Sequence, residues 1–542
     1  MNNHRHYSIS GLASIAAIIC VAVYSRSLLC GFVDYDDPDY ILNNPLIRTL
    51  DGNMVLQAFR EPHVGWWMPL TWISLAADYH FWGLNPAGYH LTNMFLHSIN
   101  TGLVVVMTDR FLRSRVMCGH LKGVSQFWCV PLLAGLLWGL HPLRVESVAW
   151  ATERKDVLNG LCVLSSLVLY LNYAERKEAR KPAYLYYFAS MTLFACSLMA
   201  KSVSVVLPVL LLVLDWFPLG RFKNTAVMPL LLEKVPFLSL SLVITFITVR
   251  FAGDSSYLVS NALFPWYERI LVSGNAVMQY MRYTLWPSGI TPYHVIPDPV
   301  PLVSYAVATG AVFCLTMILL LMAHKVVWPC AAWLLFLLPL VPVLAFIQNG
   351  DQGFAARFTY LSGIAPAVSA SFLIGSALET LYKRLNGKMI ALVLVLLLLA
   401  GYSVMTFRLI SVWDNGATMW TRAVEYAPSS PAYWRRAIYY SSVGNSQEAV
   451  KDYSMAITLL TPVWRPYVYN LYAHRGQASF DNGDFKAAVT DLTAAIEMYP
   501  HTDYYWLRGN ALRRMGKVKE AEADLARAGE GFESLGWYFE SR

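Results

Sequence analysis

An all-α membrane protein with a helical repeat array at its C-terminal end is the fold class that the sequence predicts. Of the 542 residues, 56% are hydrophobic and only 14% are charged, and the mean hydropathy is +0.41. Soluble domains are considerably less apolar. Apolar runs long enough to cross a bilayer, about 17 to 25 residues each, recur from Tyr7 to Arg408. After Trp413 the composition turns polar, so we divide the chain into a membrane domain, 1–412, and a soluble domain, 413–542.

The charged residues and the cysteines argue against other classes of protein. The formal net charge is +7, but Lys and Arg lie in short clusters between apolar runs, which argues against a nucleic-acid partner. The eight cysteines lie in or beside apolar runs and form no CxxC pair, so neither a disulfide framework nor a zinc site is predicted. The first apolar run lacks a convincing small-residue cleavage site, and we interpret it as a retained span.

Eleven apolar segments are predicted to span the membrane, and the basic connections between them give the orientation. With this count every basic connection falls on one side, which the positive-inside rule makes cytoplasmic. The external side then receives a long first loop, 32–90, and the C-terminal domain. The predicted spans are 8–31, 91–112, 126–142, 157–173, 183–200, 203–219, 235–251, 302–323, 327–347, 359–381 and 388–408. The basic connections are 110–122, 175–181, 220–223, 324–325 and 382–388.

The segment 267–287 is apolar enough to be a twelfth span. Counting it as one would place the basic connections 324–325 and 382–388 outside, against the positive-inside rule. We therefore favour a helix that lies at, or re-enters, the external interface. An ordinary span is the alternative.

Three units after Trp413 resemble tetratricopeptide repeats, with aromatic, glycine and alanine residues at matching places. The distance from Pro428 to Pro462 is 34 residues and that from Pro462 to Pro500 is 38, so the middle unit carries an insertion. Stacked helix pairs create a concave groove suited to an extended peptide, and a role in capping the membrane domain is the alternative. The units are 429–462, 470–500 and 503–528.

The stretch that follows the first predicted span, "GFVDYDDPDYILNNP" (31–45), places four aspartates within six residues. Asp36 and Asp37 lie close to apolar residues, where an ionised carboxylate needs a cation or hydrogen bonds to compensate for lost hydration. Ionisable groups in such places are often functional. The alternative is that these acids only solvate a loop.

Five motifs lie at the ends of predicted spans, in this order: "YDDPDYILNNPLIR" (35–48), "YHLTNMFLHSIN" (89–100), "HPLRVESVAWATERKDVLNGL" (141–161), "PVLLLVLDWFPLGR" (208–221) and "ARFTYL" (356–361). Together with the repeats after the last span, they resemble the membrane glycosyltransferases of the GT-C fold. Within that class the chain is similar to the branch with transmembrane and tetratricopeptide-repeat regions, the protein O-mannosyltransferases and their bacterial relatives. The resemblance covers nearly the whole chain.

The resemblance implies an enzyme that takes one sugar from a polyprenyl-phosphate carrier at the external face and passes it to a hydroxyl acceptor. Asp36 would be the general base that removes the proton of the attacking hydroxyl, which gives inversion, and Asp37 would orient the acceptor or Asp36. Relatives often have Asp-Glu here, so the Asp-Asp of this chain leaves open which acid is the base. No cofactor is firmly predicted; a divalent cation at Asp36 and Asp37 is an option, since some GT-C enzymes use one.

The leaving lipid phosphate needs cations to stabilise its developing charge. Arg357, at the predicted external mouth of a span, is the first candidate for binding this phosphate. Lys201 is the second, because a lysine between two apolar runs is costly at membrane depth unless an anion meets it. The alternative for Lys201 is that its ammonium group reaches the interface along an extended side chain.

The connection 143–156 carries charges of both signs on the predicted external side. In the resembling family this loop contributes to the active site, so its charged residues become candidates for contacts with the sugar or the phosphate. A structural ion-pair cluster is the alternative. The candidates are Glu146, Arg154, Lys155 and Asp156. The motifs add Tyr40, His141 and Tyr360 as further substrate-binding candidates, and the segment "PYHVIP" (292–297) adds His294; the two histidines are more often structural.

His90, Asn93 and His97 follow one another at spacings of three and four residues, which places them on one face of a helix. We favour packing and hydrogen bonding to the first loop over metal ligation for this face. His90 and Asn93 are also candidates for substrate binding.

The function predicted from these features is an integral membrane glycosyltransferase whose repeats present a protein acceptor. A glycosyltransferase that modifies a lipid-linked or surface glycan is the first alternative, and a non-catalytic scaffold that assembles envelope proteins is the second. A transporter is disfavoured because the charges concentrate in external loops. Compact loops and one short repeat array favour a bacterial inner membrane, with the first loop and the repeats in the periplasm. The predicted partners are the polyprenyl-linked sugar, an acceptor protein and membrane lipids.

Overall fold

The computed structural model describes residues 8–114, 129–254, 264–347, 351–382, 387–461 and 464–529. Within these ranges the regular elements are helices, apart from isolated bridges such as the one between His63 and Trp66. The all-α prediction is thus confirmed for the described residues. The chain forms two compact units, which divide between Asp414 and Asn415. The second unit also takes in 291–301, which the sequence did not indicate.

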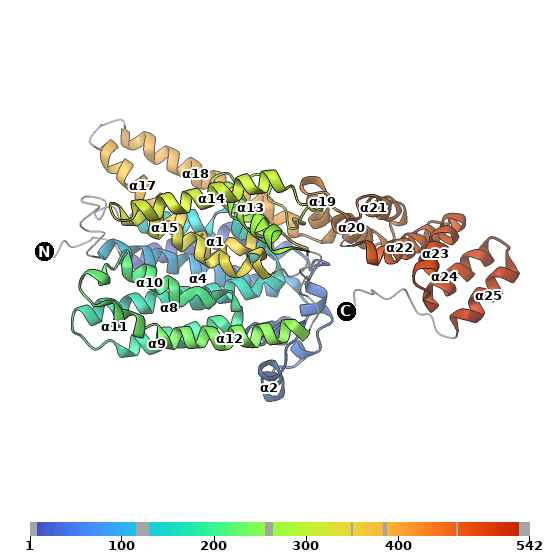
Figure 1. Ribbon diagram of the computed structural model, residues 1–542, viewed down its shortest axis with the longest axis horizontal. Helices are drawn as coiled ribbons and strands as arrows, with labels where there is room; N and C mark the ends of the chain where they lie inside the picture. The colour runs from blue at the N-terminus through green and yellow to red at the C-terminus, as the bar shows by residue number, and fades with distance from the viewer. Residues whose placement is uncertain are drawn as a thin grey trace. The chain divides into compact units, whose positions relative to one another are not determined.

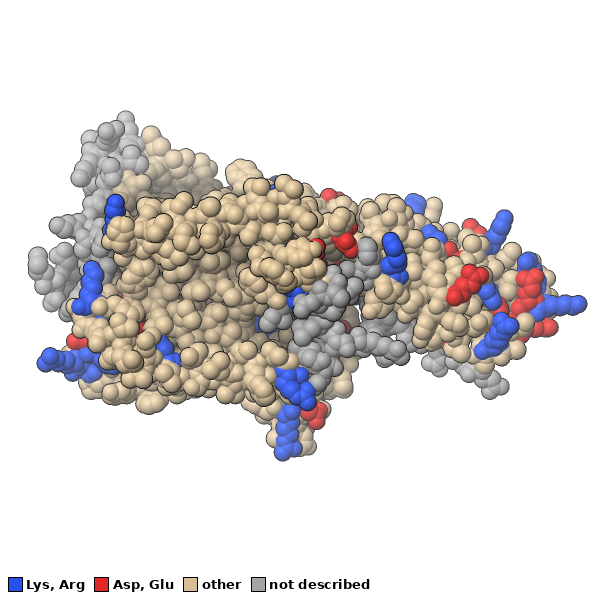
Figure 2. Space-filling view, viewed as in Figure 1, with Lys and Arg blue, Asp and Glu red and all other residues tan. Residues whose placement is uncertain are grey.

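The first unit consists of α-helices joined by short 3₁₀ turns, and α8, α12 and α14 lie with their axes roughly parallel (Figure 1). On the face shown in Figure 2 their surface is largely uncharged, as a helix surface in contact with lipid must be. The helices are α1 (Ile9–Tyr24), α2 (Gly52–Arg60), α3 (Pro69–Trp82), α4 (Pro86–Arg113), α6 (Cys129–Gly139), α7 (Val145–Ala149), α8 (Arg154–Glu178), α9 (Tyr184–Ala200), α10 (Leu207–Trp216), α11 (Val227–Leu232), α12 (Val235–Asp254), α13 (Trp266–Leu285), α14 (Leu302–Met322), α15 (Val327–Leu337), α16 (Thr359–Ser362), α17 (Ile364–Tyr382) and α18 (Gly387–Ile410).

Helix α4 lies in the core of the first unit, packed against α1, α6 and α8. It buries polar side chains that a soluble core would rarely contain, and these bond to backbone carbonyl groups of neighbouring elements. Asn93 donates to the carbonyl oxygen of Trp150 at 3.0 Å, and Asn100 donates to that of Val157 at 2.9 Å. Such bonds hold helices together where burial of apolar surface gives little preference between lipid and protein.

Each of the eleven predicted spans coincides with a helical segment, although residues 126–128 lie outside the described ranges. Six segments have the length and apolar composition to cross a membrane, if the bent pair α16–α17 counts as one. The other five are shorter apolar helices: Cys129–Gly139, Tyr184–Ala200, Ser202–Trp216, Val235–Phe251 and Val327–Val343. Helix α13 is not among these candidates, and its place at the interface stays a prediction. So does the orientation, because parts of two basic connections, 115–122 and 383–386, lie outside the described residues.

The predicted span 359–381 is helical but not straight. The segment breaks into α16 and α17, which meet at an angle of 58°. The Arg144 guanidinium donates to the carbonyl and, at 2.7 Å, to the hydroxyl oxygen of Thr359 in the short helix before the break. Pro366, in the first turn of α17, has no N–H to continue a helix from α16. The 3₁₀ turn Ala356–Phe358, which carries Arg357, directly precedes α16.

The second unit contains the three predicted repeats as helix pairs, preceded by one helix that the sequence did not distinguish. Small residues permit the close packing: a Cβ atom on Gly476 would lie 2.9 Å from Cγ of Leu492. The helices are α19 (Gly416–Tyr426), α20 (Ser430–Ser442), α21 (Ser446–Thr458), α22 (Val468–Asp481), α23 (Phe485–Met498), α24 (Thr502–Arg514) and α25 (Val518–Ala528). The predicted insertion forms a short turn, Arg465–Tyr467; residues 462–463 lie outside the described ranges.

An identical ion pair joins the two helices of every repeat. In the middle repeat Arg475 donates twice to Asp491, at 2.8 and 2.7 Å, and once to Ser454 of the preceding repeat at 3.1 Å. The equivalent pairs are Arg436 with Asp452 and Arg508 with Asp524. Each arginine therefore links three successive helices.

Replacing Arg475 by Ala is expected to lower the free energy of unfolding of the repeats by about 2 kcal/mol, because Asp491 is left buried without its partner. Chemical unfolding of the full chain in detergent measures this change, with proteolysis of the repeats as the signal for their unfolding. The matched control is Lys451→Ala, whose side chain and partner Glu448 are 59% and 44% exposed, and we expect a loss below about 0.5 kcal/mol. Equal losses in the two variants would contradict the structural role of the buried pair.

Candidate functional site

The two adjacent acids of the loop after α1 have different partners. Asp37 is 1% exposed; it accepts hydrogen bonds from the Val33 N–H at 2.8 Å and from the N–H and hydroxyl of Thr152. Asp36 is about a third exposed, and its Oδ2 atom lies 3.4 Å from Nζ of Lys155. Asp37 thus holds the loop against the turn before α8. Asp36 is the acid that a substrate can reach.

Burial raises the pKa of Asp37 to about 7, although the bonds from Thr152 and Val33 oppose this shift. Because the folded pKa lies above the unfolded value of 3.8, the unfolded chain loses this proton first as the pH rises. The stabilisation that Asp37 gives is therefore largest below about pH 4 and declines towards pH 7. We expect wild type to lose more thermal stability than Asp37→Asn between pH 5 and 7, which melting curves of both proteins in detergent measure. Parallel pH dependence would contradict the assignment.

Glu153 lies at the centre of an ion network that includes Lys155, Lys201 and Arg357. Its carboxylate oxygens are 3.2 Å from Nζ of Lys155, 3.4 Å from Nζ of Lys201 and 3.4 Å from Nε of Arg357. Glu153 is fully buried, so three cations converge on a desolvated carboxylate. Through Lys155 the network reaches Asp36, which joins the acid and the cations predicted from distant parts of the sequence.

The Arg357 side chain is held on three sides. Its Nη1 atom is 2.5 Å from Oε1 of Glu146, its Nη2 atom donates to Gln352 at 2.8 Å, and its backbone N–H donates to Glu146 at 3.1 Å. Burial raises the pKa of Glu146, and the guanidinium of Arg357 opposes that shift. Arg357 remains 11% exposed, so part of this fixed cation faces open space.

Lys201 occupies an extended residue between α9 and the following 3₁₀ turn. Its ammonium group lies 2.6 Å from Asp156 and borders a small polar cavity of about 20 Å³. Arg357 and Tyr360 line the same cavity, and Asp156 also accepts from Ser147 at 3.1 Å. Both candidates for phosphate binding thus face one space.

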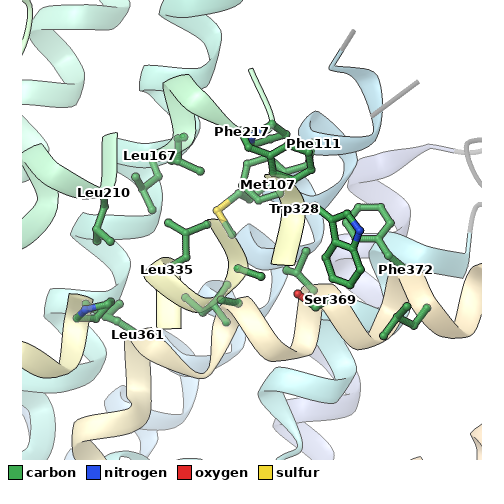
Figure 3. Close-up of a pocket in the computed structure, with 18 of the residues that line it drawn as sticks. Met107, Phe111, Leu167, Leu210, Phe217, Trp328, Leu335, Leu361, Ser369 and Phe372 are labelled. Carbon is green, nitrogen blue, oxygen red and sulfur yellow. The ribbon is translucent and has the colours of Figure 1, made fainter. Parts of the chain in front are cut away.

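A larger apolar cavity of about 340 Å³ lies among α4, α8, α10, α15 and α17 (Figure 3). Leu335, Phe217 and Trp328 line it, and Ser369 is one of its few polar residues. Pro339 and Leu361 belong to the walls of both the apolar and the polar cavity. The apolar cavity is therefore adjacent to the space that Lys201 and Arg357 border.

Several predicted site residues are not in this network. Arg154 is fully buried and pairs with Asp78 at 2.5 Å and with Asn93 at 2.6 Å, so it joins α8 to α3 and α4. His141 accepts from the N–H of Leu143 through Nδ1 and lies 3.1 Å from the carbonyl oxygen of Thr284. His294 belongs to the second compact unit. The structure thus gives Arg154 and His141 structural partners.

The helix face of His90, Asn93 and His97 is buried, as expected for packing. His90 lies 3.3 Å from the carbonyl oxygen of Gly31 in the first loop, and His97 contacts the hydroxyl of Tyr360 at 2.9 Å. Tyr360 is buried. Nζ of Lys155 lies over the ring of Tyr40, 4.7 Å from the ring centroid. Within the described part of the chain, no group of three or more His, Cys, Asp or Glu side chains is arranged to hold a metal ion.

Two residues of this site were not among the sequence candidates, Glu153 and Trp150. Trp150 stacks on Tyr35 of the acidic loop, and both Lys155 and Arg357 lie within 6 Å of its ring centre. The sequence could have identified Glu153, because it directly precedes Arg154 and Lys155 in a loop already expected to contribute to the active site. No comparable signal marked Trp150, because tryptophans are common along this chain.

Comparison with known proteins finds two kinds of similarity. The tetratricopeptide repeat family matches residues 469–502. The protein O-mannosyl-transferase Tmtc1 of Drosophila melanogaster is 33% identical over 181 residues, which cover 32% of this chain and 19% of the relative. The human protein O-mannosyl-transferase TMTC2 is 29% identical over 179 residues, covering 32% of this chain and 20% of the relative.

The human protein O-mannosyl-transferase TMTC4 is 25% identical over 311 residues, which are 52% of this chain and 37% of the relative. The chain thus spans between about a fifth and two fifths of the length of these relatives. The similarity agrees with the resemblance carried by the sequence motifs and with the helical repeats of the second unit. This chain is a homologue of the protein O-mannosyl-transferases with transmembrane and tetratricopeptide-repeat regions.

Proposed function

We propose that this protein transfers a sugar from a polyprenyl-phosphate donor to a hydroxyl group of an acceptor protein. One observation carries the proposal: the accessible acid Asp36 and the cations Lys201 and Arg357 belong to one connected ion network beside an apolar cavity. An acid that removes a proton and cations that hold a leaving anion are the two requirements of this reaction. The names of the relatives, protein O-mannosyl-transferases, support the same activity.

In the proposed reaction Asp36 acts as the general base. The acceptor oxygen attacks the anomeric carbon while its proton passes to the Asp36 carboxylate. The bond between that carbon and the phosphate oxygen breaks, and its electron pair leaves with the lipid phosphate. Attack opposite to the leaving group inverts the anomeric centre. Arg357 and Lys201 stabilise the negative charge that grows on the phosphate, so the phosphate can leave as an anion without a proton donor.

The apolar cavity accounts for the lipid part of the donor. Its walls are aliphatic and aromatic side chains from five helices, suited to an isoprenoid chain. A chain in this cavity would bring its phosphate end to the wall shared with the polar cavity, near Pro339 and Leu361. There the phosphate would take over part of the pairing that Asp156 and Glu153 now provide to Lys201.

We place the protein in a bacterial inner membrane, with the first loop and the repeats in the periplasm, and we assign acceptor binding to the repeats. The test uses the purified full chain, a labelled polyprenyl-phosphate sugar, and protein and glycan fractions as acceptors. Label in protein is the expected result. Label in glycan alone would overturn the protein acceptor, and label in neither would overturn the transferase.

The acid pair does not fit a divalent cation. Both oxygens of Asp37 already accept bonds from Val33 and Thr152, so only Asp36 has a carboxylate oxygen facing open space. A site with one accessible carboxylate holds such ions weakly. We therefore expect transfer in excess EDTA to stay within about twofold of the rate with added Mg²⁺ or Mn²⁺. A loss of activity that either metal restores would contradict this.

A further inference from the structure

Three aromatic rings connect the acidic loop to the last residues of the first unit. The ring of Tyr35 stacks on that of Trp150, with centroids 4.9 Å apart and planes inclined by 9°. Trp150 also stacks on Trp413, at 5.3 Å and 19°. Tyr35 directly precedes Asp36, and Trp413 lies two residues before Asn415, where the second unit begins. The stack therefore spans from the residue before the proposed base to the 3₁₀ turn that follows α18.

Asp414 makes a second set of contacts with the segment that leads into the acidic loop. Its Oδ2 atom pairs with Nη2 of Arg26 at 2.6 Å, and its Oδ1 atom accepts from Sγ of Cys30 at 3.3 Å. Its carbonyl oxygen accepts from the N–H of Gly31 at 2.9 Å. A Cβ atom on residue 31 would lie 3.2 Å from that oxygen, so a side chain there would force the segments around Gly31 and Asp414 slightly apart.

The indole ring of Trp150 also contacts Lys155, which pairs with Asp36, and Arg357. Nζ of Lys155 lies 5.6 Å and Cζ of Arg357 lies 5.5 Å from its centroid, distances at which a cation is attracted to an aromatic face. A shift of Trp150 would therefore change the place of the base and of the phosphate-binding cations together. Trp150 is 1% exposed, so its position depends on the rings packed around it.

We propose that Trp413 and Asp414 are positioning residues for sugar transfer: they fix Trp150 and the acidic loop, and so set the distance between Asp36 and Arg357. Neither residue touches substrate in this scheme. The inference rests on the proposed function, but the clasp itself, formed by Trp413 and Asp414 with Arg26, Gly31, Tyr35 and Trp150, is a separate structural claim. Because the chain enters the repeat unit at Asn415, these two residues also connect that unit covalently to the site.

Hydrogen exchange of the full chain in detergent tests the clasp without any assay of activity. The N–H groups of Gly31, Val33 and Tyr40 are bonded, so their exchange reports the loop. We expect Trp413→Ala to speed exchange over 31–43 at least tenfold, and Trp413→Phe, which keeps a stacking ring, to stay within about threefold of wild type. Asp414→Ala, at a partly exposed residue, serves as a second variant if Trp413→Ala does not fold.

Transfer kinetics on the same proteins test the consequence. If the clasp positions Asp36, kcat falls at least tenfold in Trp413→Ala and recovers in Trp413→Phe. Trp333→Ala is the matched control, because Trp333 is 8% exposed, donates to Thr316 of α14 and has its ring against Phe336 of α15. It should lower the melting temperature and leave both kcat and exchange over 31–43 unchanged.

Unchanged exchange in Trp413→Ala and Asp414→Ala would overturn the proposal, and so would faster exchange with an unchanged kcat. Loss of kcat and of loop protection in Trp333→Ala as well would also overturn it, because a general loss of stability would then explain both. If wild type transfers no sugar, the proposed function fails, and the exchange comparison still decides whether the clasp holds the loop.

Discussion

Replacing Asp36 by Asn is expected to lower kcat for sugar transfer by about a thousandfold, within the range that removal of a general base produces. The amide cannot take the proton of the acceptor hydroxyl, yet it has nearly the same size. The effect should appear in kcat with little change in the KM of the donor, because the lost interaction acts in the transition state. Initial rates with a labelled polyprenyl-phosphate sugar measure both constants.

Two variants of the same loop separate this role from a general effect of lost charge. Asp39→Asn changes an exposed acid three residues away and should keep kcat within about twofold. Asp37→Asn removes the hydrogen-bond acceptor of Val33 or Thr152 and so loosens the loop. We therefore expect this variant to have a lower melting temperature. Loss of transfer in Asp39→Asn equal to that in Asp36→Asn, or full activity of Asp36→Asn, would contradict the assignment of the base.

The helical segments and the repeats could be predicted because each is encoded locally. A run of apolar residues must form a helix if it crosses lipid, since every backbone polar group then needs an internal partner. The repeats are predicted by the regular spacing of similar residues along the sequence. At the break between α16 and α17, Pro366 is a local signal, but the bonds of Arg144 to Thr359 join residues more than 200 positions apart, which no local pattern reveals.

The candidate site shows a similar division. Asp36, Lys201 and Arg357 were chosen separately: Asp36 from an acidic motif and the family resemblance, Lys201 as a lone charge between apolar runs, and Arg357 from its place at the mouth of a predicted span. That Glu153 connects them is a property of tertiary packing. Arg154 and Lys155 illustrate the limit: they are neighbours at the start of α8, and a helix turns by about 100° per residue. Arg154 consequently meets Asp78 while Lys155 meets Asp36. Both side chains are buried, so a pattern of exposed polar residues could not have told the two apart.

The ion network also accounts for the stability of the proposed phosphate site before a donor binds. Three largely buried cations without counterions would be strongly destabilising. Glu153 and Asp156 provide those counterions, and under the proposed function a phosphate oxygen would replace them at Lys201. Glu146 differs, because it binds both the side chain and the backbone N–H of Arg357 and so fixes the direction of the guanidinium.

Arg357→Ala is the second variant with a large expected effect. Without the guanidinium the leaving phosphate loses a fixed cation in a partly desolvated site, and we expect kcat/KM for the donor to fall by about two to three orders of magnitude. Arg357→Lys should recover only part of this loss, since a lysine cannot reproduce the paired contacts with Glu146 and Gln352. Steady-state rates at varied donor concentration measure these changes.

Stability must be separated from catalysis in this experiment, because Arg357→Ala also leaves Glu146 buried without its main partner. Burial already raises the pKa of Glu146, so without Arg357 this carboxyl would be driven further towards its neutral form at a cost to folding. The double variant Arg357→Met with Glu146→Gln removes both charges and should recover most of the lost melting temperature. If Arg357 binds the phosphate, the double variant remains as inactive as Arg357→Ala. Recovery of transfer together with stability would show instead that Arg357 serves the fold alone.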